Sequence, residues 1–106
     1  MQIHKKNEFG RRKQQLAQYA KAIAHPARIA ILRKLAEDKK CICGELVKVL
    51  PLSQSTVSQH LKELKNAGLI RGTVKGPKSI YTINQPAVDQ FRDEFKRLMS
   101  NLKEKK

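Results

Sequence analysis

The chain has 106 residues and a formal net charge of +14, which arises from 23 Lys and Arg against 9 Asp and Glu. A chain of this length buries one small core and leaves little room for a deep catalytic cavity, so a large enzyme is excluded. The excess of positive charge indicates a polyanionic partner.

Hydropathy and charge also indicate where in the cell the protein is expected. Lys and Arg interrupt every apolar stretch before it reaches the ~20 residues that span a bilayer. The basic N-terminal residues are not followed by the apolar segment of a secretion signal. The sequence therefore predicts a cytoplasmic protein without a membrane partner, in which basic tails over residues 1–7 and 104–106 flank one domain over residues 8–103.

The first half of the chain predicts three helices. Apolar residues at helical spacing predict a helix over residues 8–24, and the dipeptide His25-Pro26 ends it. A second helix is expected over residues 26–36, because Pro suits the first helical position and the residues that follow form an apolar stripe. The stripe consists of Ile29, Leu32, Leu35 and Ala36. A short third helix that ends at Pro51 has on one face Ile42, Leu46, Val49 and Leu50.

The second half predicts a fourth helix, a β-hairpin and a last helix. Ser53 has the side chain of a helix N-cap, and Gly68 has the conformational freedom that ends a helix, so we expect a helix over residues 54–67. Strands are expected over residues 69–74 and 79–83, on either side of a basic turn. The last helix begins at Asn84 and Pro86.

This order predicts a mainly α-helical fold with a small β-hairpin, a winged helix-turn-helix of the form α-α-α-α-β-β-α. The fourth helix is the expected reader of a polyanion, because the side opposite Val57 carries no apolar side chain. Hydroxyl and amide groups suit DNA base edges, and lysines suit phosphates. The polar side consists of Ser55, Ser58, Gln59, Lys62, Lys65 and Asn66, and Lys75 and Lys78 of the hairpin extend it.

Two other interpretations of this surface stay open. A polar helix face with lysines is often only a solvated surface. A winged helix can also serve as a protein-binding or RNA-binding module. The low aromatic content of 5% argues against single-stranded RNA, because readers of single strands need exposed aromatic platforms.

A long apolar seam on the last helix predicts a homodimer. A domain of this size has few elements to cover the seam, so we expect it to pair with the first helix of a second copy, although it could instead fold back on its own core. Two-fold pairing would place two reading helices about 34 Å apart, on a palindromic operator. The expected interface consists of Leu16, Tyr19, Ile23, Val88, Phe91, Phe95, Leu98, Met99 and Leu102.

Three segments, residues 24–28, 41–46 and 52–62, resemble the bacterial ArsR/SmtB repressors, and the resemblance extends over residues 9 to 102. It implies a homodimeric winged-helix repressor of double-stranded operator DNA, in a bacterium, that releases the operator when an inducer binds. It also implies operator contacts from Ser55, Thr56, Ser58, Gln59 and His60. The expected DNA contacts are therefore Ser53, Gln54, Ser55, Thr56, Ser58, Gln59, His60, Lys62, Lys65, Asn66, Lys75 and Lys78.

The inducer site is expected at Cys41 and Cys43, and a thiolate-bound metal or metalloid ion is the only cofactor that the sequence suggests. In the members that this chain resembles, another thiol completes a similar Cys-x-Cys pair, whereas Leu46 stands one turn later here. Neighbouring lysines and the helix start are expected to favour the thiolate form. The same thiols could sense oxidants or only pack as small apolar groups. No spacing of residues predicts a catalytic site.

Overall fold

The computed structural model describes residues 9–104. Its elements, in chain order, are α1 (Gly10–Ile23), α2 (Pro26–Asp38), β1 (Cys41–Ile42), α3 (Cys43–Val49), α4 (Gln54–Asn66), β2 (Ile70–Lys75), β3 (Lys78–Ile83) and α5 (Gln85–Asn101). The predicted order of helices and hairpin is confirmed, and a short strand is added. The tails predicted over residues 1–7 and 104–106 lie outside the described residues, except for Glu104.

Local chemistry explains how α1 gives way to α2. His25 has an extended backbone, with φ of −160° and ψ of 127°, which turns the chain out of α1. Its Nδ1 then accepts a hydrogen bond of 3.2 Å from the backbone N–H of Ala27 and so caps α2. Pro26 occupies the first helical position, where its missing N–H costs nothing.

The three strands form one antiparallel sheet in the order β1-β3-β2. In β1, Cys41 pairs with Tyr81 and Ile42 pairs with Ile80. This strand was not predicted, because two residues are too short to show a period and the pairing partner lies far along the chain. The expectation that Ile42 belongs to the third helix is therefore wrong, and Val49 at the end of that helix is 54% exposed.

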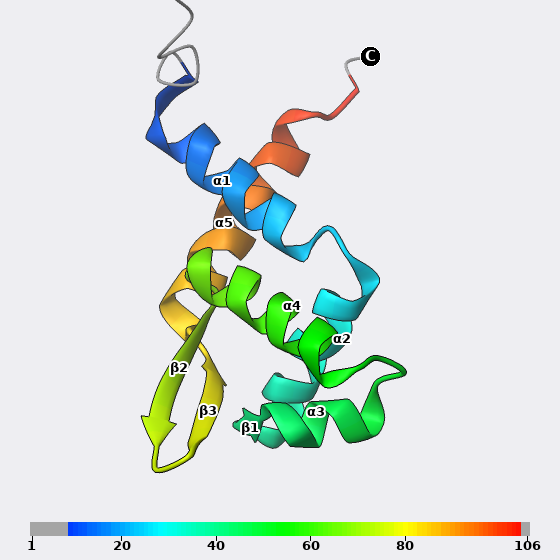
Figure 1. Ribbon diagram of the computed structural model, residues 1–106. Helices are drawn as coiled ribbons and strands as arrows, with labels where there is room; N and C mark the ends of the chain where they lie inside the picture. Colours follow the sequence, from blue (N-terminus) through cyan, green and yellow to red (C-terminus); the bar gives the residue numbers. More distant parts are fainter. Residues whose placement is uncertain (1–8, 105–106) are drawn as a thin grey trace, which may run out of the picture.

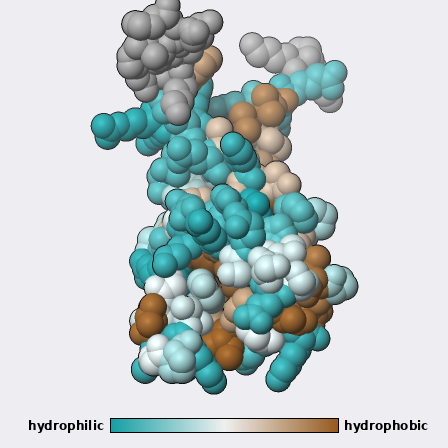
Figure 2. Space-filling view, viewed as in Figure 1, coloured by the Kyte–Doolittle hydropathy of each residue, from teal (hydrophilic) through white to brown (hydrophobic). Residues whose placement is uncertain are grey.

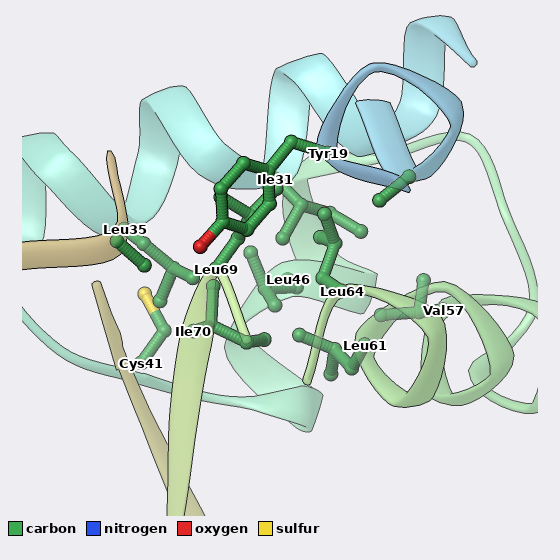
Figure 3. Packing of buried hydrophobic residues seen from close by; sticks show 12 residues of the cluster. Tyr19, Ile31, Leu35, Cys41, Leu46, Val57, Leu61, Leu64, Leu69 and Ile70 are labelled. Carbon is green, nitrogen blue, oxygen red and sulfur yellow. The ribbon is translucent and has the colours of Figure 1, made fainter. Parts of the chain in front are cut away.

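Side chains from all five helices, from β1 and from the start of β2 converge on one core (Figure 3). The stripe expected on α2 is partly wrong, because Ile31 is fully buried while Ile29 is 45% exposed. Both are apolar, and packing against α4 and the sheet decides which of two adjacent helical stripes faces inward. The completely or almost completely buried residues are Ile31, Leu35, Cys41, Leu46, Val57, Leu61, Leu64, Leu69 and Ile70.

Helices α1 and α5 cross and extend beyond the rest of the fold, at the end opposite the β2–β3 hairpin (Figure 1). The rings of Tyr19 and Phe91 pack against each other within the chain, with their centroids 5.3 Å apart. These two residues of the expected dimer interface are therefore already in contact inside one copy. Farther along α5, Phe95, Leu98, Met99 and Leu102 remain exposed. No helix in the described part of the chain is long and apolar enough to cross a membrane.

Candidate nucleic-acid interface

The first turn of α4 is held by a network of hydroxyl groups. The Oγ of Ser53 accepts a hydrogen bond of 3.3 Å from the backbone N–H of Thr56. The same Oγ lies 3.0 Å from Oγ1 of Thr56 and 3.2 Å from Oγ of Ser55. These contacts satisfy part of the helix N-terminus and fix the exposed hydroxyls in position. The remaining N–H groups of this turn can bind an anion.

The polar side of α4 is exposed as one surface. Val57, Leu61 and Leu64 are fully buried and hold the helix against the core. The opposite side lines a concavity of about 450 Å³ between α4 and the hairpin. Its lining consists of Ser55, Ser58, Gln59, Lys62, Lys65, Asn66 and Tyr81. The six polar residues of α4 are those that the helical period predicted, and Tyr81 of β3 was missed.

Gly72 of β2 leaves room for the ring of Tyr81 on the paired strand β3. A side chain at Gly72 would place its Cβ 3.1 Å from Cε1 of Tyr81 and 3.5 Å from Cδ of Lys65. The 3.1 Å distance is tighter than a relaxed contact, so the ring of Tyr81 would have to shift by a few tenths of an ångström, whereas 3.5 Å from Lys65 is an ordinary van der Waals contact. The β-strand period of the hairpin did not reveal this constraint, because it comes from the ring of Tyr81, which lies over its partner Gly72 on the neighbouring strand.

The cations at the hairpin tip lie apart from the concavity. Lys75 and Lys78 are paired across the two strands and are exposed. Gly76, with φ of +63°, provides the left-handed conformation that the turn between them needs. Two adjacent ammonium groups on a projecting hairpin suit a phosphate backbone, where a flexible point charge needs no precise orientation.

Gln59 already has a partner in the free protein. Its Nε2 donates a hydrogen bond of 3.0 Å to Oε2 of Glu63, one turn later on the exposed side of α4. This contact orients the amide and leaves its carbonyl oxygen available. Glu63 is not among the predicted site residues, so its contact with Gln59 was missed.

The structure corrects the expected position of His60. Its side chain is only 7% exposed, and its Nδ1 accepts a hydrogen bond of 3.1 Å from Nε of Arg28. The imidazole ring also packs against that of His25, with 4.4 Å between centroids. Burial, and then the nearby His25 and Arg28, lower the pKa of His60. His60 therefore couples α4 to α2 inside the fold and is not available to DNA.

The expected thiolate form of Cys41 is also wrong. Its side chain is 1% exposed, and its Sγ donates a hydrogen bond to Oδ2 of Asp38 at 3.6 Å. Burial and this carboxylate raise the pKa of Cys41 to about 11, which outweighs the smaller opposite effect of Lys34. Cys43 is half-buried, and burial raises the pKa of its thiol. Its Sγ lies 4.0 Å from the backbone oxygen of Gln54, the first residue of α4.

These thiols do not fit a metal or metalloid ion that needs three ligands. Within residues 9–104 no group of three or more His, Cys, Asp or Glu side chains is placed to hold a metal. Leu46, one turn after the cysteines, is fully buried in the core. The arrangement therefore offers two protonated thiols and one nearby carboxylate, which is short of a closed tetrahedral site.

Comparison with known proteins places this geometry among bacterial regulators. Residues 25–71 match the family described as bacterial regulatory protein, arsR family. The chain is 44% identical over 63 residues to the HTH-type transcriptional repressor SmtB of Mycobacterium tuberculosis. This match covers 59% of this chain and 46% of SmtB, so the chain spans about half the length of that relative. It is 37% identical over 73 residues to the transcriptional repressor PagR of Bacillus anthracis, which covers 69% of this chain and 73% of PagR.

Solved structures show the same architecture. The crystal structure of PagR from Bacillus anthracis superposes with a TM-score of 0.65 at 32% identity, over 73% of this chain and 87% of that one. An ArsR-like transcriptional regulator from Rhodococcus superposes with a TM-score of 0.73, over 84% of this chain and 83% of that one. Its identity is 21%, so this second likeness concerns the fold alone.

Proposed function

Because this chain belongs to the arsR family of bacterial regulatory proteins, a family of transcriptional regulators and not of enzymes, we propose that it is a repressor that binds double-stranded operator DNA in the bacterial cytoplasm. The observation that carries the proposal is the exposed polar side of α4 beside a basic hairpin. That surface combines hydroxyl and amide groups that can read bases with lysines that can bind phosphates, and sequence-specific binding needs both kinds of contact.

The residues of this surface divide by chemistry. Gln59 can pair with adenine through two hydrogen bonds, and Ser55 and Ser58 can donate or accept at base edges. The first turn of α4, with Ser53, Gln54 and Thr56, would bind a phosphate through backbone N–H groups and hydroxyls. The remaining proposed contacts are to phosphates, from Lys62, Lys65, Lys75 and Lys78, with Asn66 at the edge of the reading surface.

We propose that two copies pair through α1 and α5 and bind a palindromic operator. An apolar hollow of about 250 Å³ is lined by Ile23, Val88, Phe91 and Phe95, together with Arg92. It continues into the exposed apolar residues of α5, which no described part of the same chain covers. Leu16 is half-buried and lies on the same helix as Ile23, whereas Tyr19 packs internally. The proposed interface therefore consists of Leu16, Ile23, Val88, Phe91, Phe95, Leu98, Met99 and Leu102.

The direct test is binding of the protein to DNA from its own promoter, with a scrambled duplex of equal length as control. Six to ten phosphate contacts would reduce affinity by roughly 10³ to 10⁵ between 50 and 200 mM salt. We expect tighter binding to the promoter than to the scrambled duplex, and a dimer in analytical ultracentrifugation. Equal binding to both duplexes with a flat salt response would favour a protein-binding or RNA-binding module.

We further propose that a thiol-dependent inducer acts at Cys43 rather than at Cys41. Cys43 is the more accessible thiol, and its contact with the backbone oxygen of Gln54 links it to the start of the reading helix. A bulky group on this sulfur would displace the first turn of α4 and weaken DNA binding. Treatment with a maleimide should therefore release DNA from the wild type and from Cys41→Ser, but not from Cys43→Ser. Binding that no thiol reagent releases would leave a regulator with structural cysteines.

A further inference from the structure

We infer that the hollow between α1, α2 and the C-terminal half of α4 binds a phosphodiester group of the same DNA that α4 reads. The hollow has a volume of about 690 Å³, and its polar lining consists of Gln18, Lys21, His25, Arg28, Glu63 and Asn66. This inference rests on the proposed DNA-binding function, and it adds a second backbone contact on the side of α4 away from the hairpin.

The position of the hollow provides the first argument. Asn66 lines both this hollow and the concavity beside the hairpin, so the two depressions meet at the C-terminal end of α4, one on its α1 side and one on its hairpin side. A helix in the major groove lies between two phosphate strands, and phosphate contacts fix its register. The hairpin can contact only the phosphate strand on its own side of α4. Figure 2 shows hydrophilic side chains over the face where α1 and the C-terminal half of α4 lie, which continues the polar surface of α4 toward α1.

The charge of the hollow provides the second argument. Lys21 and Arg28 bring two cations to it, and neither takes part in the ion pairs found among residues 9–104. Glu63 is the only carboxylate in the lining, and its Oε2 already accepts a hydrogen bond from Gln59. The unbalanced positive charge favours an anion.

Arg28 is held ready to bind. Its Nε donates to Nδ1 of His60 and its Nη1 donates to the backbone oxygen of Ala22, both at 3.1 Å. The guanidinium is therefore fixed in orientation before DNA arrives, and its Nη2 group is not used in these two contacts. A fixed guanidinium loses little conformational entropy on binding a phosphate, which makes it an effective partner.

His25 adds a neutral donor. Its Nδ1 accepts the N–H of Ala27, so in the neutral ring the proton is assigned to Nε2. The lining thus offers an ammonium group, a guanidinium group, an imidazole N–H and the amides of Gln18 and Asn66. This set of donors suits the non-bridging oxygens of a phosphodiester.

The test compares two lysine variants in DNA binding. Lys21→Gln removes one charge from the hollow, and Lys34→Gln removes one charge from a lysine of α2 that does not line it. If a two-fold dimer loses one phosphate contact per copy, the slope of log affinity against log salt should fall in magnitude by about 1.8 for Lys21→Gln. Its affinity should fall by the same factor for promoter and scrambled DNA. Lys34→Gln should leave the slope unchanged, and equal slopes for both variants would overturn the inference.

A second measurement locates the contact on the DNA. Methylphosphonate groups remove the charge of single phosphates at the edges of each half-site. We expect one position at which the substitution weakens the wild type but not Lys21→Gln, while Lys78→Ala stays sensitive there. Lack of such a position would contradict the inference even if the protein reads its promoter through Gln59. If the wild type itself fails to prefer promoter DNA, the proposed function fails first and the inference with it.

Inorganic phosphate serves as the probe for a different occupant. Titration of the free protein with phosphate, followed by NMR of the backbone amides near Lys21, measures binding without DNA. Saturation at low millimolar phosphate that Lys21→Gln abolishes, combined with unchanged DNA binding, would assign the hollow to a free anion and overturn the inference.

Discussion

The Nε of Arg28 donates a hydrogen bond of 3.1 Å to Nδ1 of His60, and this contact joins the first turns of α2 to the middle of α4. Because Nδ1 is the acceptor, the bond requires the neutral imidazole. The ring of His25, which caps α2, packs against the same imidazole. The placement of the reading helix therefore depends on a His60 imidazole that remains uncharged.

This arrangement predicts that stability depends on pH. The pKa of His60 is lowered in the folded protein, so below about pH 6.5 the unfolded chain binds a proton that the folded chain does not. The free energy of unfolding should therefore fall as the pH drops below 6.5, by at most about 1.4 kcal/mol per pH unit for this group. Urea unfolding between pH 5 and 8 measures the slope.

His60→Asn is the matched control for that experiment. The amide oxygen of Asn can accept from Arg28 in place of Nδ1, yet the side chain does not titrate. We expect a lower overall stability and a clearly flatter dependence below pH 6.5. An unchanged slope in His60→Asn would show that groups other than His60 cause the pH dependence.

Gln59→Ala and Lys78→Ala should separate base reading from phosphate binding. Loss of a bidentate contact to adenine costs about 1 to 3 kcal/mol and relaxes the preference for the operator. Loss of a phosphate contact weakens all sequences by a similar factor. Binding of each variant to operator and scrambled duplexes checks the division. Equal losses on both duplexes for Gln59→Ala would argue against a base contact.

Lys39→Gly should stabilise the fold. Lys39 follows the end of α2 with φ of +67°, a conformation that is unfavourable for a residue with a Cβ. Glycine removes this strain, partly offset by the greater freedom of the unfolded chain, for a net gain of roughly 0.5 to 1 kcal/mol. Urea unfolding compares it with Lys40→Gly, which has no positive φ to relieve and should not gain stability.

The two cysteines should differ in reactivity. At pH 7.5, a thiol with a pKa of about 11 is almost entirely protonated, and Cys41 is also buried. Iodoacetamide should therefore modify Cys43 first and leave Cys41 unmodified until the protein unfolds. Peptide mass spectrometry over time follows each site, and faster modification of Cys41 in the native protein would contradict the buried hydrogen bond to Asp38.

Leu98→Glu should disrupt the proposed dimer. Leu98 is 38% exposed within the chain, and a carboxylate there would be buried without a partner in a two-copy interface. We expect a shift toward monomer in analytical ultracentrifugation, together with weaker binding to the full operator. Ser100→Glu, at an exposed position two residues along α5, is the control. A Leu98→Glu variant that remains dimeric would place the interface elsewhere.

Much of the fold follows from short-range chemistry that the sequence displays. Ser53 caps α4 through its own hydroxyl, and Gly68, with φ of +87°, allows the chain to turn at the end of that helix. The exposed face of α4 is likewise a consequence of helical geometry, because Val57, Leu61 and Leu64 must face inward together. Such features depend on residues a few positions apart, so the sequence alone determined them.

Tertiary structure decided the features that depend on residues distant in the chain. Pairing with β3 turned Cys41 and Ile42 into a strand, and packing against α4 and the sheet chose Ile31 over Ile29 for the core. The contact between Arg28 and His60 joins residues that are 32 positions apart in the chain. It turns inward a histidine that was expected on the reading face. The pKa of Cys41 depends on burial, which local sequence does not reveal. Each of these outcomes required knowing which surfaces meet, because desolvation and long-range pairing arise only when the elements pack.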